Sequence, residues 1–127
     1  MVDIREQSPL SLAFVGDAVY SLLIREHFVT SKRYNINVLN KMTVKYVSAH
    51  GQFMALELIK DTLTDEELSF VKRGQNASKA SVAKNASVAE YRASTGFEAL
   101  LGYLKLTGQD ERIEYLVTYI LENLKFE

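Results

Sequence analysis

Two apolar helical segments of this chain each carry a single carboxylate, and this pattern limits the folds that can hold them. Asp17 lies within Leu-Ala-Phe-Val-Gly-Asp-Ala-Val-Tyr, and Glu98 lies within Thr-Gly-Phe-Glu-Ala-Leu-Leu-Gly-Tyr-Leu. Neither acid has a Lys or Arg three or four residues away on its own helix. A single acid of this kind is usually solvated or paired with an Arg or a backbone donor. Because burying an unpaired carboxylate is costly, the occurrence of two favours a shared divalent cation.

Helix signals run through the chain and strand alternation is absent, so we predict an all-α fold. Ser8 and Pro9 are a cap and first-turn pair that opens a helix over about residues 9–28. Its apolar residues cover nearly all faces, so we expect this helix to be central. Asn37 is expected to cap a second helical region that runs to about residue 60, with a break at Gly51.

The second half of the chain has clearer helix boundaries. Residues 64–67, Thr-Asp-Glu-Glu, form a capping box that opens a short helix, and Gly74 is expected to end it. Residues 75–89 are rich in Ser, Ala and Asn, which predicts a mobile loop with a short helix and a working surface. Two further helices are predicted over residues 88–106 and 110–124.

Length and composition exclude several classes of protein. A chain of 127 residues with one Pro and no repeat predicts a single domain over residues 1–127. With no Cys, and with His27 and His50 lacking a partner at metal-ligand spacing, zinc is not expected. The acidic start does not resemble a signal peptide, and Asp17 interrupts the longest apolar run, so we expect no membrane segment and a cytoplasmic protein.

The net charge of −1 hides two stretches without acids, residues 27–56 and 71–89. Together they contain eight of the 15 basic residues and none of the 16 acids. Solvated Lys and Arg side chains are the ordinary explanation, but Lys, Arg, Asn and Gln clustered together suit a phosphate backbone. The predicted RNA-binding residues are Lys72, Arg73, Gln75, Asn76, Lys79, Lys84, Asn85 and Arg92. Oxygen ligands for Mg²⁺ beside such a surface are typical of phosphodiester hydrolysis.

Four motifs, taken in order, resemble those of the ribonuclease III family, in its compact Mini-III branch without a double-stranded-RNA-binding domain. They are Leu-Ala-Phe-Val-Gly-Asp-Ala-Val-Tyr at residues 12–20, Lys-Arg-Gly-Gln-Asn at 72–76, Lys-Asn at 84–85 and Tyr-Arg-Ala-Ser-Thr-Gly-Phe-Glu-Ala-Leu-Leu-Gly-Tyr-Leu at 91–104. The resemblance extends over essentially the whole chain.

This resemblance implies the ribonuclease III endonuclease-domain fold, a homodimer, and one Mg²⁺-dependent site per subunit that cuts one strand of an RNA duplex and leaves 5′-phosphates. Asp17 and Glu98 match two of the family's catalytic metal ligands. The implied substrate is double-stranded RNA, specifically the stem that joins the ends of the 23S ribosomal RNA precursor, and a ribosomal protein is a further candidate partner.

Two positions depart from the larger enzymes of the family, which carry further acids four residues before the Asp and three before the Glu. Here these positions are Ala13 and Thr95. The halved acid set suggests one well-held Mg²⁺, and the Thr95 hydroxyl is a candidate to hold a water molecule of the metal site. Two alternatives stay open: a catalytically silent RNA-binding module associated with the ribosome, and a helical dimer whose basic face binds an acidic protein.

Overall fold

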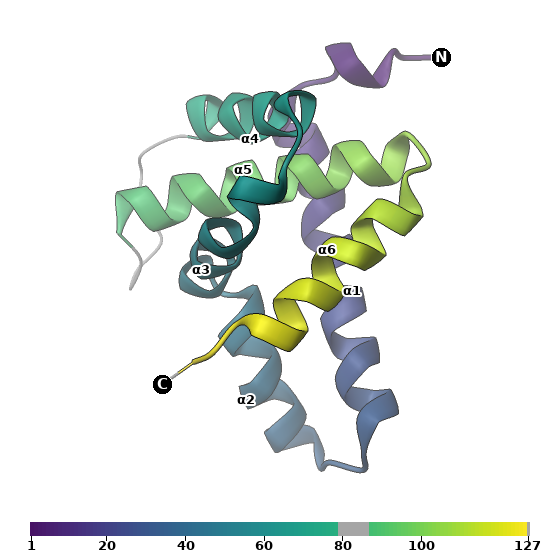
Figure 1. Cartoon of the computed structure of the whole chain (residues 1–127), viewed down its shortest axis with the longest axis vertical. Helices are drawn as coiled ribbons and strands as arrows, with labels where there is room; N and C mark the ends of the chain where they lie inside the picture. Colours follow the sequence, from purple (N-terminus) through teal and green to yellow (C-terminus); the bar gives the residue numbers. More distant parts are fainter. Residues whose placement is uncertain (79–86, 127) are drawn as a thin grey trace.

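Helices make up nearly all of the described part of the chain (Figure 1). The computed structural model describes residues 1–78 and 87–126, and no β-strand occurs in these ranges. The α-helices are α1 (Pro9–Ser31), α2 (Ile36–Val47), α3 (Ala49–Ile59), α4 (Asp65–Ala77), α5 (Val88–Leu106) and α6 (Asp110–Asn123). Two short 3-10 segments, η1 (Ile4–Glu6) and η2 (Lys60–Thr62), precede α1 and α4. The all-α prediction is therefore confirmed.

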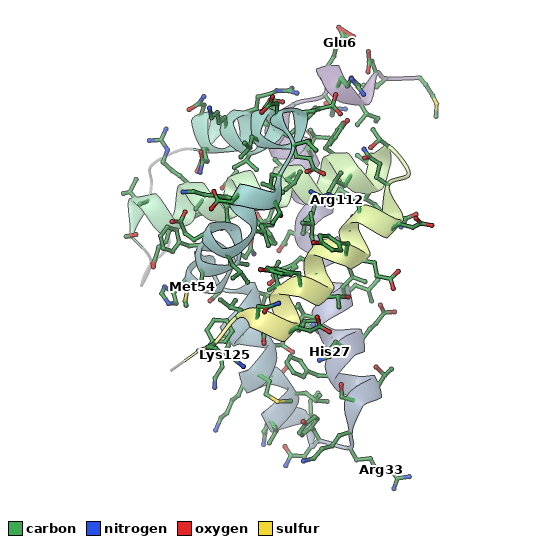
Figure 2. The ribbon with its side chains drawn as sticks, viewed as in Figure 1. Glu6, His27, Arg33, Met54, Arg112 and Lys125 are labelled. Atoms are coloured by element: carbon green, nitrogen blue, oxygen red, sulfur yellow. The ribbon has the colours of Figure 1, made fainter. Side chains whose placement is uncertain are left out.

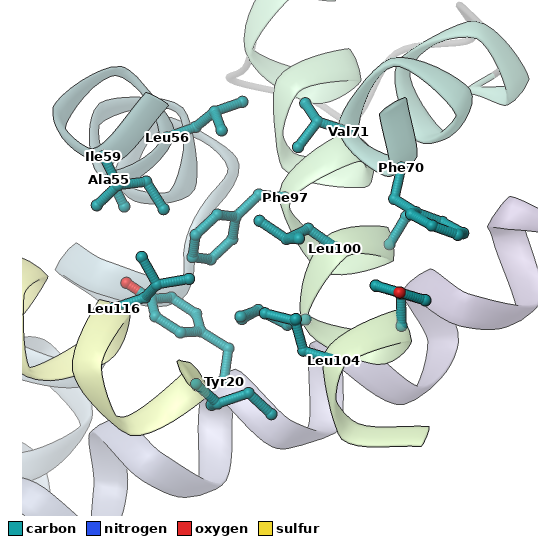
Figure 3. Close-up of a cluster of buried hydrophobic side chains, with 14 of the residues drawn as sticks. Tyr20, Ala55, Leu56, Ile59, Phe70, Val71, Phe97, Leu100, Leu104 and Leu116 are labelled. Atoms are coloured by element: carbon teal, nitrogen blue, oxygen red, sulfur yellow. The ribbon is translucent and has the colours of Figure 1, made fainter. Parts of the chain in front are cut away.

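The central helix is α5, which packs against α1, α3, α4 and α6. Phe97, Leu100 and Leu104 of α5 are fully buried, and Tyr20 of α1 meets Phe97 edge-on with ring centroids 4.9 Å apart (Figure 3). Leu116 of α6 closes the same cluster. Apolar side chains from all four neighbouring helices thus bury most faces of α5, which explains its near-continuous apolar sequence.

The prediction that the first helix would be central is wrong. One face of α1 is buried, but the opposite face carries exposed apolar side chains, among which Phe14 is 83% exposed. Spacing of four residues sets these side chains in a stripe along the helix: Leu10, Phe14, Ala18 and Leu22, with Val29 two turns further on. An apolar stripe of this kind on a lone subunit is typical of a protein interface. No helix in the described residues is long and apolar enough to cross a membrane.

The break in the second helical region lies at Ser48, not at the predicted Gly51. Ser48 takes an extended conformation and its hydroxyl accepts a hydrogen bond from the Gly51 amide at 3.0 Å, so it caps α3. Gly51 lies inside α3, where a Cβ atom would overlap the Lys45 carbonyl oxygen. Asn35, not Asn37, caps α2 through the Val38 amide at 3.0 Å.

The later helix boundaries agree more closely with the predictions. Thr64 and Glu67 form the predicted capping box, while Gly74 does not end α4, which continues to Ala77. Gly74 is needed instead for close packing, because a Cβ atom there would lie 2.8 Å from Gly96 Cα. The predicted helix over residues 88–106 coincides with α5, and α6 ends one residue before the predicted boundary. Residues 79–86 of the predicted loop lie outside the described part.

Candidate active site

The two predicted carboxylates meet where α1 crosses α5. A Cβ atom built on Gly16 would overlap the carbonyl oxygen of Glu98, and one built on Gly102 would overlap the carbonyl oxygen of Leu12. The two helix backbones therefore touch, which only glycine permits at these positions. Because Asp17 follows Gly16, the crossing sets its carboxylate beside that of Glu98, close enough for its negative charge to raise the pKa of Glu98.

The surroundings of Glu98 disfavour its charged form. Burial raises the pKa of Glu98 to about 8, a hydrogen bond from Gln52 offsets part of this rise, and the negative charge of Asp17 adds to it. Without a cation, the raised pKa thus favours the protonated form of Glu98 near neutral pH. A divalent cation held by Asp17 and Glu98 would replace that proton and favour the ionised form of Glu98.

Asp17 differs from Glu98 in exposure: it is exposed, whereas Glu98 is half-buried. The expectation that both acids are buried is wrong for Asp17. Position 17 lies at the edge between the buried face of α1, marked by Gly16 and Tyr20, and the exposed apolar stripe that includes Ala18. The acid pair is therefore accessible to solvent on the Asp17 side. A site for a large substrate requires such access.

The residues present fit a hard cation with oxygen ligands. In residues 1–78 and 87–126, no Lys, Arg or His forms an ion pair with Asp17 or Glu98. The same ranges contain no cluster of three or more His, Cys, Asp or Glu side chains suited to a metal. Two carboxylates leave most coordination positions to water and phosphate, as is usual for Mg²⁺.

Sequence analysis missed one residue of this site, Gln52. Its side-chain nitrogen donates a hydrogen bond to Glu98 Oε2 at 3.0 Å across two helices that are distant in sequence. A signal was present, because Gln52 shares the buried face of α3 with Ala55, Leu56 and Ile59. An amide on an otherwise apolar face requires a partner in the core, but the pattern does not identify that partner.

Thr95 is buried one turn before Glu98 on α5. Its hydroxyl lies within hydrogen-bond distance of the Tyr91 carbonyl oxygen, at 3.2 Å, and of the Ser78 hydroxyl, at 3.4 Å. These contacts join the start of α5 to the end of α4. The suggested role of Thr95 in holding a water molecule stays a prediction.

The predicted RNA-binding residues occur on two packed helices and in the segment between them. Lys72 and Asn76 are exposed on α4, Gln75 is half-buried, and Arg92 of α5 donates from Nε to the Gln75 carbonyl oxygen at 3.1 Å. Lys79, Lys84 and Asn85 lie outside the described residues. The other acid-free stretch is distant only in part: Arg33 lies at the tip of the α1–α2 hairpin, at the opposite end of the molecule from α4 (Figure 2), whereas His50 lies 2.6 Å from Glu90 at the start of α5.

Arg73 is engaged by the N-terminal segment. Its guanidinium donates to the carbonyl oxygens of Arg5 at 2.9 Å and Gln7 at 3.0 Å, and stacks over Phe70. These bonds hold η1 and the start of α1 against α4. Arg73 therefore has a structural role that its place in a basic cluster did not indicate, and its contact with RNA stays a prediction.

Comparison with known proteins gives consistent results. A family model described as "Ribonuclease III domain" matches residues 10–109. Proteins named Mini-ribonuclease 3 are similar: one from Enterococcus faecalis is 44% identical, over 98% of this chain and 96% of the relative, and one from Streptococcus pneumoniae is 42% identical, over 98% and 99%. The crystal structure of protein FN1578 from Fusobacterium nucleatum superposes with a TM-score of 0.86 at 32% identity, over 96% of this chain and 98% of that one.

Proposed function

The chain belongs to the ribonuclease III family and is an endoribonuclease, and from this premise we propose that it is a Mg²⁺-dependent enzyme that cleaves double-stranded RNA as a homodimer. Residues 1–127 would form one catalytic domain. The observation that carries the proposal is the pair Asp17 and Glu98, two adjacent carboxylates with a neutral amide as their nearby donor and a raised pKa at Glu98. Adjacent acids without a positively charged partner favour cation binding over a purely structural role.

Asp17 and Glu98 would hold the Mg²⁺. When bound, the ion supplies positive charge that lowers the pKa of water and offsets charge developing on the phosphate. Hydrolysis adds water across the bond between phosphorus and O3′: the water oxygen bonds to phosphorus, and O3′ leaves with the bonding electrons and takes up a proton. Products of this reaction carry a 5′-phosphate and a 3′-hydroxyl. Exposed Asp17 can face the RNA, while Glu98 is held by a hydrogen bond from the buried side chain of Gln52.

The RNA backbone would contact the outer side of α4 and the start of α5. Exposed Lys72 and Asn76 offer a cation and an amide there, beside Gln75 and Arg92. Lys79, Lys84 and Asn85 stay in the proposed surface on the basis of their sequence alone. Shape and backbone contacts dominate the recognition of duplex RNA, so this surface suits a stem such as that of the 23S ribosomal RNA precursor. A ribosomal protein remains a candidate partner that presents such a stem.

The apolar stripe on α1 supports the homodimer. Phe14 is the most exposed of its large apolar residues, and Asp17 lies beside it on the same helix. Pairing of two such stripes would remove apolar surface from water and bring two sites to a common interface, one for each RNA strand. Phe14→Glu should therefore give monomers in light scattering after size exclusion, whereas Leu106→Glu, at an exposed position outside the stripe, should leave the assembly unchanged.

The first experiment is cleavage of a long RNA duplex with Mg²⁺ and with EDTA, with the product ends mapped on both strands. Wild-type protein should give staggered cuts in Mg²⁺ only, and Asp17→Asn should give none while binding RNA within a few-fold of wild type. Glu26→Gln, which removes an exposed acid elsewhere on α1, is the matched control and should cleave normally. Cleavage by Asp17→Asn at the wild-type rate would refute the assignment. Binding without cleavage under every condition would favour the silent RNA-binding module.

A further inference from the structure

Gln52 connects the kink between α2 and α3 to the acid pair. Its side chain is 2% exposed, and its nitrogen donates to the carbonyl oxygen of Val47 and to Glu98 Oε2, both at 3.0 Å. Val47 is the last residue of α2, so its carbonyl oxygen has lost the helical partner that a continuous helix would provide. The Gln52 amide therefore donates the hydrogen bond that the Val47 carbonyl oxygen lacks at the kink, and it also holds the Glu98 carboxylate on α5.

The two acceptors determine the orientation of the Gln52 amide. The Val47 carbonyl oxygen cannot donate, so exchange of the amide oxygen and nitrogen would set oxygen against oxygen at that contact, and it would also remove the donor from Glu98 Oε2 when the carboxylate is ionised. The Glu98 carboxylate is thus fixed at Oε2 by a neutral donor. A Lys or Arg in this place would supply the positive charge itself and compete with a metal ion, whereas an aliphatic side chain would leave Glu98 free to rotate.

The cost of placing Gln52 here argues against a purely stabilising role. Its own side-chain oxygen is buried and has no hydrogen-bond partner among the described residues, which also holds for the Tyr20 hydroxyl. A buried acceptor without a donor destabilises a fold. The neighbouring core positions of α3 are filled by Ala55, Leu56 and Ile59, so an aliphatic residue is what packing alone would favour at this position.

We propose that Gln52 is a positioning residue of the metal site: its amide fixes the Glu98 carboxylate in the orientation that binds the cation, without neutralising its charge. The inference rests on the proposed function, because it requires a cation at Asp17 and Glu98. It adds a positioning residue from α3 to the two predicted metal ligands on α1 and α5. In this way the kink at Ser48 becomes part of the site, since it provides the second acceptor that orients the amide.

The test measures metal binding in the absence of RNA, by titrating the folded protein with Mn²⁺ and following free Mn²⁺ by electron paramagnetic resonance. Gln52→Met keeps the length of the side chain and removes the donor, and should bind Mn²⁺ about tenfold more weakly than wild type. Ile59→Val perturbs the same face of α3 away from Glu98 and controls for loss of core packing; its Mn²⁺ affinity should equal that of wild type.

Glu98→Gln separates failure of this inference from failure of the proposed function. If wild type and Glu98→Gln bind Mn²⁺ equally, the metal site is wrong and the inference falls with it. If Glu98→Gln loses binding but Gln52→Met binds within twofold of wild type, the metal site stands and the role of Gln52 is refuted.

A measurement on the wild-type protein covers the case in which Gln52→Met does not fold. The side-chain amide resonances of Gln52 should shift during a Mg²⁺ titration, with the midpoint seen for the backbone amide of Glu98. Resonances of the Gln52 amide that do not change while those of Glu98 do would overturn the proposal.

Discussion

Two glutamates of this protein lie in closely packed helices but have opposite electrostatic surroundings. Glu67 of α4 is 5% exposed, and its carboxylate accepts hydrogen bonds from Arg112 Nε and Nη2 of α6, both at 2.9 Å. Burial alone would raise the pKa of Glu67, but Arg112 and the Thr64 amide lower it below its usual value. Glu98 of α5 receives one bond from neutral Gln52 and faces the negative charge of Asp17, so its pKa is raised.

The difference teaches that burial of a carboxylate does not by itself indicate a functional site. Glu67 is fully compensated within the chain: it completes a capping box and pairs with an arginine, so it joins α4 to α6 and needs nothing further. Among residues 1–78 and 87–126, no such cation pairs with Glu98, so its charged form has an electrostatic requirement that a metal ion can satisfy. Variants of the two regions should consequently differ in whether they affect stability or activity.

The largest expected effect comes from the backbone contact that supports Glu98. In Gly16→Ala, the new methyl group would overlap the Glu98 carbonyl oxygen, so α1 and α5 must separate, and we expect a loss of about 4 kcal/mol or more in unfolding free energy. Urea denaturation followed by circular dichroism measures this loss. Gly108→Ala is the comparison: nothing lies near its Cβ position, and its φ of 74° should cost only about 1 kcal/mol. Equal losses of unfolding free energy in the two variants would show that the close contact between α1 and α5 does not require glycine at position 16.

The next largest effect should come from loss of the ion pair between Glu67 and Arg112. Glu67→Gln leaves half-buried Arg112 beside a neutral group and should lower the free energy of unfolding by about 3 kcal/mol, while the folded fraction cleaves RNA at the wild-type rate. Glu57→Gln, which breaks the exposed pair with Lys60, should change stability by no more than about 0.5 kcal/mol. Loss of cleavage by fully folded Glu67→Gln would contradict the conclusion that Glu67 contributes to stability and not to activity.

A smaller effect should appear in the pH dependence of stability in EDTA. Because the pKa of Glu98 is raised to about 8, the folded protein binds a proton that the unfolded chain releases at lower pH. Stability from this group is thus complete at acidic pH and falls as pH rises towards the folded pKa, by about 2 kcal/mol between about pH 5.5 and 7.5. Glu98→Gln should remove this decrease and be the more stable protein at about pH 7.5. Identical pH profiles of wild type and variant would exclude the raised pKa.

The smallest expected effect concerns RNA affinity. Lys72 shares α4 with Glu67 but points to solvent, so Lys72→Ala should leave stability unchanged, weaken duplex binding a few-fold and reduce the salt dependence of binding by about one phosphate contact. Binding in Ca²⁺ at several salt concentrations measures both quantities. Lys60→Ala, outside the acid-free stretches, is the matched control and should bind RNA as wild type does. Equal salt dependence of binding in wild type, Lys72→Ala and Lys60→Ala would show that Lys72 does not contact the RNA.

Local signals predicted the range of α5 well from its helical pattern, and the start of α4 from its capping box. They failed at Gly51 and Gly74, which we interpreted as a helix break and a helix end. Both glycines lie inside helices, where they allow another backbone to approach closely. A glycine has the same appearance in a sequence whether it serves a turn or a close contact, so the distinction requires the neighbouring helix.

Local sequence was enough to establish the helical fold, the capping box at Thr64, the two acids and the family resemblance, because each depends on residue types close together in the chain. Tertiary packing decided that Asp17 is exposed, that Arg73 binds the N-terminal segment, and that Gln52 meets Glu98 although 46 residues separate them. Such contacts depend on how helices cross, and the crossing of α1 with α5 is set by direct backbone contact at Gly16 and Gly102. The pattern of a single helix describes which face is buried, but the partner of a buried polar group is chosen by the arrangement of all the helices together.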